Sequence, residues 1–320
     1  MGLAFLTPFG ALLGLLALLP LGVYVFRQRR VARIRGVLGL RGPSLRSRAP
    51  VALSVTAVPA LMGLAAMQPV IESDRVRQQR TDAEAWVVLD TSRSMLASEK
   101  AGSATRFERE RELAVRLSEE LPEVPMGLAS MTDRVLPHVF PTTDGRVVRT
   151  ALREAMGVEQ PGPTVSLTGT PTTTFDSLAA IPTRNYFSPA AEKRLLVVLT
   201  DGETRPPEQD LSGPFGRGKK ITTLIVRVGK PGEQIWFGGT PEDAYQPYGD
   251  AAAALARVAD QTGARVLEDD PNGVVAAARA TLGTGPTADR IIEGERQALM
   301  PWVTLAAFLP LGFVLFRRNL

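Results

Sequence analysis

The sequence predicts an α/β domain with a doubly wound, mostly parallel sheet, together with three transmembrane helices. Two observations support this fold class. Between residues 82 and 284, short apolar runs typical of buried strands alternate with longer segments in which apolar and charged residues mix, as in helices. Outside that region, three long runs contain no charged side chain. We therefore expect one globular domain attached to a membrane.

The composition excludes several function classes. The chain has 320 residues, is 44% hydrophobic, and contains no cysteine and one histidine. Disulfides, thiolate chemistry and sites with several imidazoles are therefore absent. The formal charge of +4 is distributed unevenly, because residues 27–48 hold eight arginines and no acid. Residues 82–284 hold 22 basic and 28 acidic side chains, a net charge of 22 − 28 = −6. An acidic domain does not favour nucleic-acid binding.

The three uncharged runs are predicted to span a bilayer. They cover residues 1–26, 49–71 and 298–316, and each is close to the roughly 20 residues that a transmembrane helix needs. A cleaved signal peptide is the alternative for the first run, but its arginines follow the apolar stretch instead of preceding it. A buried soluble helix is the alternative for the second run, and the length of that run favours a span.

Arginine counts predict the orientation of these spans. Residues 27–48, predicted to form an Arg-rich cytoplasmic loop, carry eight arginines, and Arg317 and Arg318 follow the last span. Five arginines flank the spans on the other side. The positive-inside rule therefore places the N-terminus and residues 72–297 outside the cytoplasm. The repeated Leu-Pro-Leu-Gly at 19–22 and 309–312 indicates that the first and third spans leave the bilayer on the same side.

The elements of the domain can be justified in chain order. Strands are predicted at 85–89, 126–131, 195–199 and 221–228 from their apolar, β-branched composition, with shorter strands at 135–140, antiparallel, and 264–267. Helices are predicted at 106–121, 147–156, 175–181, 251–261 and 274–282. Residues 157–174 are too rich in Pro, Gly and Thr for regular structure. In a parallel sheet of this kind, ligands bind at the carboxyl ends of the strands.

Polar residues follow two of the buried strands at that position. Asp90, Ser92 and Ser94 follow the strand at 85–89, and Asp201 follows the strand at 195–199. A hard divalent cation prefers about six oxygen ligands. Two hydroxyls spaced two residues apart can approach one ion from the same side, with the aspartates supplying negative charge. With few charges in direct contact, the ion would stay electrophilic toward a carboxylate from a partner.

These residues give the domain its family resemblance. Asp90, Ser92 and Ser94 match the D-x-S-x-S pattern of the von Willebrand factor A domain with a metal-ion-dependent adhesion site, and Thr200-Asp201-Gly202 resembles its later T-D-G. The resemblance covers residues 82–284. It implies a Rossmann-like fold and a cation, most often Mg²⁺ and otherwise Mn²⁺ or Ca²⁺. It also implies that the two serines and a loop threonine contact the metal, while the aspartates act through water.

The loop threonine has more than one candidate. The family threonine stands two residues before the first apolar position of the next helix, here Phe175, and this spacing selects Thr173. The pair Gly169-Thr170 resembles the family's Gly-Thr and selects Thr170, and Thr172 is also close. We predict Asp90, Ser92, Ser94, Thr173 and Asp201 as the metal site. A metal-free helix cap at the first motif and an ordinary turn at the second are the structural alternatives.

Other motifs give weaker functional predictions. Residues 213–220 resemble a phosphate-binding P-loop but precede a strand and have Lys220 where Ser or Thr should stand, which favours a solvated loop. His138 is expected on a partly buried edge strand. Glu203 is expected to be a solvated loop acid, with a general base as the alternative. Trp236, Phe237, Tyr245 and Tyr248 suggest either a docking patch or an insertion folded over the sheet.

The order of spans and domain is similar to that of bacterial Bat-type, aerotolerance-associated membrane proteins. That resemblance implies a multi-pass protein of the bacterial plasma membrane, with related membrane proteins and a MoxR-type ATPase system among its partners. We expect a non-enzymatic scaffold that binds a protein carboxylate through the metal and serves envelope complex assembly or maintenance. The alternatives are a surface-anchored metal-dependent hydrolase and a structural membrane subunit with a vestigial metal site.

Overall fold

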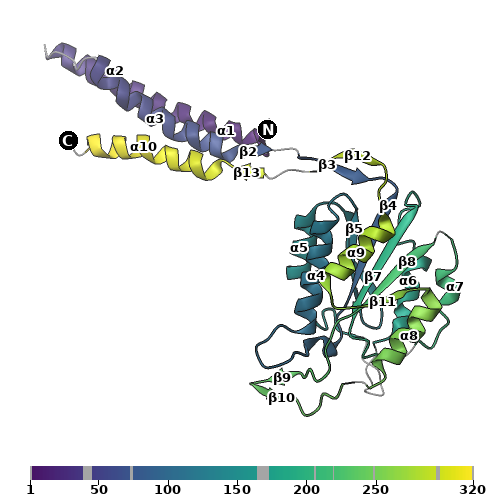
Figure 1. Cartoon of the computed structure of the whole chain (residues 1–320). Helices are drawn as coiled ribbons and strands as arrows, with labels where there is room; N and C mark the ends of the chain where they lie inside the picture. The colour runs from purple at the N-terminus through teal and green to yellow at the C-terminus, as the bar shows by residue number, and fades with distance from the viewer. Residues whose placement is uncertain are drawn as a thin grey trace. The chain divides into compact units, whose positions relative to one another are not determined.

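The computed structural model describes residues 2–38, 45–72, 75–163, 173–204, 207–218, 220–247, 249–292 and 296–318. The chain forms two compact units. The first, the membrane unit, consists of Met1–Arg75 and Ile291–Leu320, and the second, the globular unit, is Val76–Arg290. Figure 1 shows the elements of each unit.

A six-stranded sheet forms the centre of the globular unit. Its order is β11-β8-β7-β4-β5-β6, and every neighbouring pair is parallel except β5 with β6. The strands are β4 (Ala83–Asp90), β5 (Met126–Met131), β6 (Val135–Thr142), β7 (Lys193–Thr200), β8 (Ile221–Arg227) and β11 (Arg265–Glu268). The predicted mostly parallel α/β sheet is therefore confirmed, with the antiparallel strand in its predicted place.

Helices cover both faces of this sheet (Figure 1). One face packs against α4 (Arg106–Glu120), α5 (Gly145–Glu154) and α9 (Pro271–Leu282). The other packs against η4 (Phe175–Ala179), α6 (Ala180–Thr183), α7 (Ser212–Phe215) and α8 (Ala251–Thr262). All eight residues of β4 are buried, as expected for a central strand with helices on both sides. Its Val87 and Leu89 join one core and its Trp86 and Val88 the other.

Several short elements were not predicted. A 3₁₀ turn, η3 (Arg93–Leu96), follows β4, and residues 175–179, predicted as α-helix, are also 3₁₀. A hairpin of β9 (Trp236–Phe237) and β10 (Thr240–Pro241) lies between β8 and α8. Outside the predicted boundaries of 82–284, β3 (Arg75–Arg80) pairs with β12 (Thr287–Ile292). This pairing extends the folded region at both ends.

The membrane unit contains three helical segments long and apolar enough to cross a bilayer, among the residues described. The first, Pro8–Val37, consists of η1 (Pro8–Gly10), α1 (Ala11–Gly14), η2 (Leu15–Ala17) and α2 (Leu18–Val37). The others lie in α3 (Leu45–Ala66) and α10 (Met300–Arg318). Three membrane-length helices are therefore confirmed.

Residues at one end of the bundle form strands instead of helix. β1 (Gly2–Phe5), β2 (Pro69–Glu72) and β13 (Arg296–Ala298) form an antiparallel sheet in the order β1-β2-β13. The predicted spans at 1–26, 49–71 and 298–316 included residues 2–5, 69–71 and 298 of these strands, so their helical boundaries are corrected here. Apolar composition alone does not distinguish a short strand from the end of a helix. In this sheet, the strand before the first helical segment and the strand before α10 flank β2 on either side.

Five arginines after the first apolar run lie in a helix where a loop was predicted, and residues 39–44 of that predicted loop lie outside the described residues. α2 continues to Val37 and carries the five arginines from Arg27 to Arg35. Arginine has a high helix propensity, so charge ends the apolar stretch without ending the helix. At 1.5 Å per residue, the 30 residues of Pro8–Val37 span roughly 45 Å, more than the hydrocarbon core of about 30 Å. The basic end of α2 therefore extends beyond an apolar layer of that thickness.

Small residues allow close packing within the bundle. A Cβ placed on Gly63 of α3 would lie 2.6 Å from both Cα and N of Gly14. One placed on Gly10 would collide with the carbonyl oxygen of Ala66. Gly10 and Gly14 are spaced as in the small-xxx-small pattern that permits close helix approach in membranes.

Candidate metal centre

The first motif forms a compact turn at the end of β4. Ser92 is the N-cap residue of η3, and its backbone N–H donates to Oδ1 of Asp90 at 2.9 Å. The hydroxyl oxygens of Ser92 and Ser94 lie 3.0 Å apart. Both hydroxyls therefore lie on one side of the turn, directly after a buried strand, as the spacing predicted.

The second motif lies beside the first because β7 is the parallel neighbour of β4, with Leu89 opposite Leu199. The hydroxyl of Thr200 donates to Oδ2 of Asp90 at 2.6 Å, which joins the two motifs directly. The backbone N–H of Glu203 donates to Oδ1 of Asp201 at 2.8 Å.

This second turn requires glycine at its centre. Gly202 has φ +77°, in the left-handed region, and a Cβ there would lie 2.8 Å from the Leu255 side chain. The turn could therefore not form as it does with a larger residue at position 202.

The structure places Thr173 at the same edge of the sheet. Its carbonyl oxygen accepts a hydrogen bond of 2.5 Å from the hydroxyl of Thr204, in the loop that carries Asp201. The next residue, Thr174, donates its N–H to the carbonyl of Thr132 at the end of β5. Among the described residues, no hydrogen bond joins the Thr173 side chain to the serines. Thr170 and Thr172 lie outside the described residues.

Negative charge is concentrated at this edge and shielded from water. Asp90 is 1% exposed and Asp201 4% exposed. Burial, followed by the nearby carboxylate of Asp201, raises the pKa of Asp90 to about 7. Glu110 of α4 is also fully buried, and burial together with Asp90 and Asp201 raises its pKa well above the usual value. Such a cluster is a favourable environment for a cation.

Arg106 supplies a cation from the protein itself. Thr105 caps α4 in a capping box with Glu108, and Arg106 is the first helical residue. Its Nη1 donates to Asp201 Oδ2 at 2.7 Å and to Glu203 Oε1 at 2.8 Å. Burial by itself lowers the pKa of Arg106, but Asp201, Glu233 and Glu203 more than reverse this effect and raise it above the usual value.

The role of Arg106 was not predicted from the sequence. Its acidic partners lie 95 or more positions away along the chain, and no local spacing indicates such a contact. The expectation that Glu203 is a solvated acid is wrong, since its side chain is 9% exposed and paired with Arg106.

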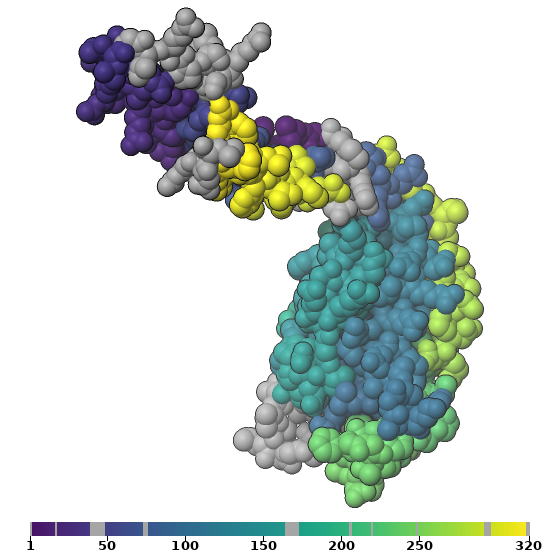
Figure 2. All heavy atoms as spheres, turned by 90° about the vertical axis from the view of Figure 1, so that its left-hand side faces the viewer, coloured from purple at the N-terminus to yellow at the C-terminus, as the bar shows by residue number. Residues whose placement is uncertain are grey.

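The segment between β8 and α8, residues 229–250, is called the insertion here. Figure 2 shows atoms of the insertion, in green, beside atoms of an earlier part of the globular unit, in blue. Backbone hydrogen bonds join Ser98 to Gln234 in both directions, and the indole N–H of Trp236 donates to the Ser98 carbonyl. The hydroxyl of Tyr245 donates to Glu203 Oε2 at 2.7 Å. The insertion is thus bound to the loops of the candidate metal centre.

One side chain of the insertion binds a residue of the first motif, and another is exposed to solvent. Glu242 accepts two hydrogen bonds from Arg93, which stands between Ser92 and Ser94 in the sequence. Phe237, at the hairpin, is 81% exposed. Of the two predicted roles, folding against the domain is therefore observed for Trp236 and Tyr245, while the ring of Phe237 is exposed at the surface. Tyr248 lies outside the described residues.

The other predicted features lie elsewhere. His138 lies on edge strand β6, and its Nε2 is 2.8 Å from the hydroxyl oxygen of Ser130 on β5. Burial lowers the pKa of His138. The P-loop-like segment begins within the four-residue helix α7 and precedes β8, so it does not join a strand to a helix as a phosphate loop would.

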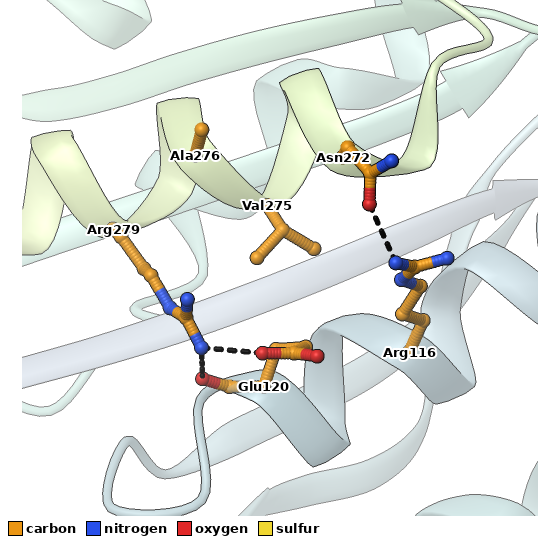
Figure 3. Close-up of a pocket in the computed structure, with 6 residues that line it drawn as sticks. All are labelled: Arg116, Glu120, Asn272, Val275, Ala276 and Arg279. Carbon is orange, nitrogen blue, oxygen red and sulfur yellow. Dashed lines mark hydrogen bonds and ion pairs between the residues drawn. The ribbon is translucent and has the colours of Figure 1, made fainter.

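A hollow of about 420 Å³ lies between α4 and α9, and none of the predicted site residues lines it (Figure 3). It is lined by Arg116, Glu120, Asn272, Val275, Ala276 and Arg279. Hydrogen bonds from Arg116 to Asn272 and from Arg279 to Glu120 cross it.

Comparisons with known proteins identify the class of the globular domain. Residues 85–203 match the von Willebrand factor type A domain, so the chain contains such a domain and that prediction is confirmed. Comparison with curated proteins gave no significant match.

Solved structures resemble part of this chain. An aerotolerance-related membrane protein from Bacteroides fragilis is 19% identical, with a TM-score of 0.50, over 62% of this chain and 98% of that one. A conserved hypothetical protein BatB from Bacteroides thetaiotaomicron is 21% identical, with a TM-score of 0.48, over 62% of this chain and 96% of that one. At these identities the likeness concerns the fold.

The donor set fits a small divalent cation. Two ligands at right angles, each about 2.1 Å from Mg²⁺, lie roughly 3.0 Å apart, and the Ser92 and Ser94 hydroxyl oxygens are separated by 3.0 Å. Among the described residues, no group of three or more Asp, Glu, His or Cys side chains is arranged to hold a metal. The arrangement is therefore one of hydroxyls supported by buried acids, as the sequence motif predicts.

Proposed function

We propose that this chain is a membrane-anchored, non-enzymatic scaffold whose von Willebrand factor A domain binds a protein partner through a divalent cation. The observation that supports it most directly is the pair of Ser92 and Ser94 hydroxyls, 3.0 Å apart beside the buried Asp90. Ser92, Ser94 and Thr173 would contact the ion, and Asp90 and Asp201 would supply negative charge through water. Mg²⁺ is the proposed ion, with Mn²⁺ or Ca²⁺ as substitutes.

When bound, the ion offers an electrophilic position to a carboxylate oxygen of the partner. The chain's own residues orient that position. Thr200 and the Ser92 N–H hold Asp90 in place, and Gly202 allows the turn that directs Asp201 toward the same edge. Burial of this edge excludes bulk water, which strengthens the attraction between a partner's carboxylate and the site.

A hydrolase is less well supported by the geometry. Glu203 is the candidate base, yet Arg106 and Tyr245 each donate a hydrogen bond to its carboxylate. A general base needs an oxygen within reach of a substrate proton. The contacts of Glu203 therefore favour binding over turnover.

We place the globular unit outside the cytoplasm of a bacterial plasma membrane, because the basic end of α2 and Arg317 satisfy the positive-inside rule on the other side. The proposed role in envelope assembly, with related membrane proteins and a MoxR-type ATPase, rests on the Bat-type order of spans and domain. That role is an analogy in architecture.

Isothermal titration of the full-length protein in nanodiscs tests the metal site. Wild type should bind one Mg²⁺ or Mn²⁺, and S92A should lose at least tenfold in affinity. S212C, on the exposed surface of α7, is the control and should bind as wild type does. Absence of binding in wild type would leave only a structural subunit with a vestigial site.

Cysteine labelling tests the orientation. Because the chain has no cysteine, S212C in the globular unit and G36C in α2 provide single thiols. A membrane-impermeant maleimide applied to intact cells should label S212C and spare G36C. Labelling of G36C alone would reverse the proposed topology.

Crosslinking in intact cells tests the partner. Wild type should gain a crosslinked protein that is lost with EDTA and with S92A. A crosslink that persists in EDTA would contradict binding through the cation.

A further inference from the structure

Arg106 holds both acids of the second motif loop. One nitrogen, Nη1, donates to Asp201 and to Glu203, and lies 3.2 Å from the hydroxyl oxygen of Tyr245. The second oxygen of each acid is also engaged, since Asp201 accepts from the Glu203 N–H and Glu203 accepts from the Tyr245 hydroxyl. All four carboxylate oxygens of this loop therefore accept a hydrogen bond from the protein.

The acid of the first motif is held in the same way. Asp90 accepts from the Ser92 N–H at one oxygen and from the Thr200 hydroxyl at the other. The hydroxyl oxygens of Ser92 and Ser94 lie 3.0 Å apart, and the Ser92 hydroxyl also donates to Asp90. A serine oxygen that donates its hydrogen keeps lone pairs available to an ion, whereas each oxygen of these three carboxylates already accepts a hydrogen bond.

Arg106 also holds a third acid, because its Nε donates to the buried Glu233 at 2.7 Å. Arg106 is the first residue of α4, where the helix dipole disfavours a positive charge, and it is 3% exposed. Arg109, one turn further along, pairs with Glu233 and Asp269 instead of Asp201 and Glu203. A buried cation close to a cation site lowers the affinity of that site, so its presence there calls for a functional explanation.

We propose that Arg106 is a built-in counter-ion that keeps Asp201 and Glu203 from coordinating the bound cation directly, which leaves a coordination position for a carboxylate from outside. This inference rests on the proposed function. Arg106 is thus a positioning residue: it acts through the two acids and does not touch the ion. Arg106 lowers the affinity of the site for the metal, and in return the bound metal keeps a higher affinity for the partner's carboxylate.

Loss of the guanidinium should change the metal site in a defined way. In R106Q the two acids are released and the local field becomes more negative. Mn²⁺ should bind about tenfold more tightly, a change of about 1.4 kcal/mol. A released carboxylate should replace an inner-sphere water, and acetate, used as the external carboxylate, should compete less well for the ion.

The experiment uses the full-length protein in nanodiscs with Mn²⁺ as the probe. Free Mn²⁺ is counted by electron paramagnetic resonance, and water-proton relaxivity gives the number of bound waters with and without acetate. R106Q should show tighter binding and at least one water fewer than wild type. R106K, which keeps the charge, should retain the wild-type water count, and R106Q/E203Q should lose most of the gain. R109Q is the matched control, since it removes a neighbouring, partly buried arginine without releasing Asp201 or Glu203.

Each result supports or overturns the proposal. Weaker or unchanged Mn²⁺ binding in folded R106Q, with the wild-type water count, would overturn it. If R106Q does not fold, Y245F takes its place: it frees one oxygen of Glu203 and should shift affinity and hydration in the same direction by less, and no shift would overturn the inference. Absence of Mn²⁺ binding in wild type would defeat the proposed function itself, which is a different result.

Discussion

The two ends of the central sheet each bury an arginine, and the two arginines bind different groups. At the amino ends of the strands, Arg80 is 4% exposed and donates to Asp82 and to the carbonyls of Leu282 and Gly283 at the end of α9. At the carboxyl ends, Arg106 is 3% exposed and donates to side-chain acids from separate loops.

The difference lies in the balance of charge. Arg80 and Lys193 share one acid, Asp82, and otherwise hold backbone oxygens, so cations are in excess in this group. Arg106 and Arg109 face four acids, Asp201, Glu203, Glu233 and Asp269. Acids are therefore in excess in the group at the carboxyl ends of the strands. Cations that hold backbone oxygens indicate a structural clamp at one end, and an excess of acids indicates a cation-binding site at the other.

The largest expected effect separates the two arginines. R80Q removes a buried charge partner and should lower the free energy of unfolding by about 3 kcal/mol, at the low end for buried pairs because Asp82 is partly exposed. Mn²⁺ affinity should not change. Denaturant unfolding followed by tryptophan fluorescence measures the first quantity. R146Q, whose pair with Asp144 is more exposed, should lose less than about 1 kcal/mol. If R80Q and R146Q lost equal free energy of unfolding, burial would not explain a structural role of Arg80.

At the other end, D90N should affect binding far more than folding. Loss of the carboxylate should weaken Mn²⁺ binding by at least about 100-fold, or about 2.7 kcal/mol. The apo protein should stay within about 1 kcal/mol of wild type, because the substitution removes a buried charge that is costly without a cation. Titration with Mn²⁺ and apo unfolding curves measure these quantities. A large loss of apo stability would mean that Asp90 is structural, like Arg80.

A smaller effect is expected from Lys193, the second cation at the amino ends of the strands. Lys193 donates to the carbonyls of Leu282 and Thr284, and its side chain is 39% exposed. K193M keeps most of the side-chain volume and should lower the free energy of unfolding by about 1 kcal/mol. The same unfolding assay measures it. A loss as large as that of R80Q would show that exposure does not weaken this contact.

The smallest effect concerns the single histidine. Burial lowers the pKa of His138 below its usual value, so below about pH 6.5 the unfolded chain binds more protons than the folded one. The contribution of His138 to stability should therefore fall slightly, by less than about 1 kcal/mol, as the pH drops from 7 to 5, while the raised pKa of Asp90 acts in the opposite direction in both wild type and H138Q. H138Q should lack this component. Unfolding curves at both pH values, with an NMR titration of the imidazole, measure it, and an identical pH dependence in H138Q would contradict it.

Much of the fold could be predicted because it depends on local pattern. The apolar run that contains Trp86 to Leu89 is buried on both faces, and such a run is typical of a central parallel strand. The Ser92 and Ser94 pair could be predicted for the same reason, since a two-residue spacing after a strand fixes its own geometry. Helix ends in the membrane unit were harder, because the strand at Gly2–Phe5 is as apolar as the helix that follows it.

The sequence by itself determined the order of spans and strands, the hydroxyl pair and the acids of the two motifs, because these follow from periodicity and short spacings. Only the tertiary structure decided which charges meet. Arg106 reaches Asp201 across 95 positions and Tyr245 across 139, and nothing in the intervening chain encodes these contacts locally. They exist because parallel strands bring their carboxyl ends to one edge, where burial makes each charge depend on its nearest partner.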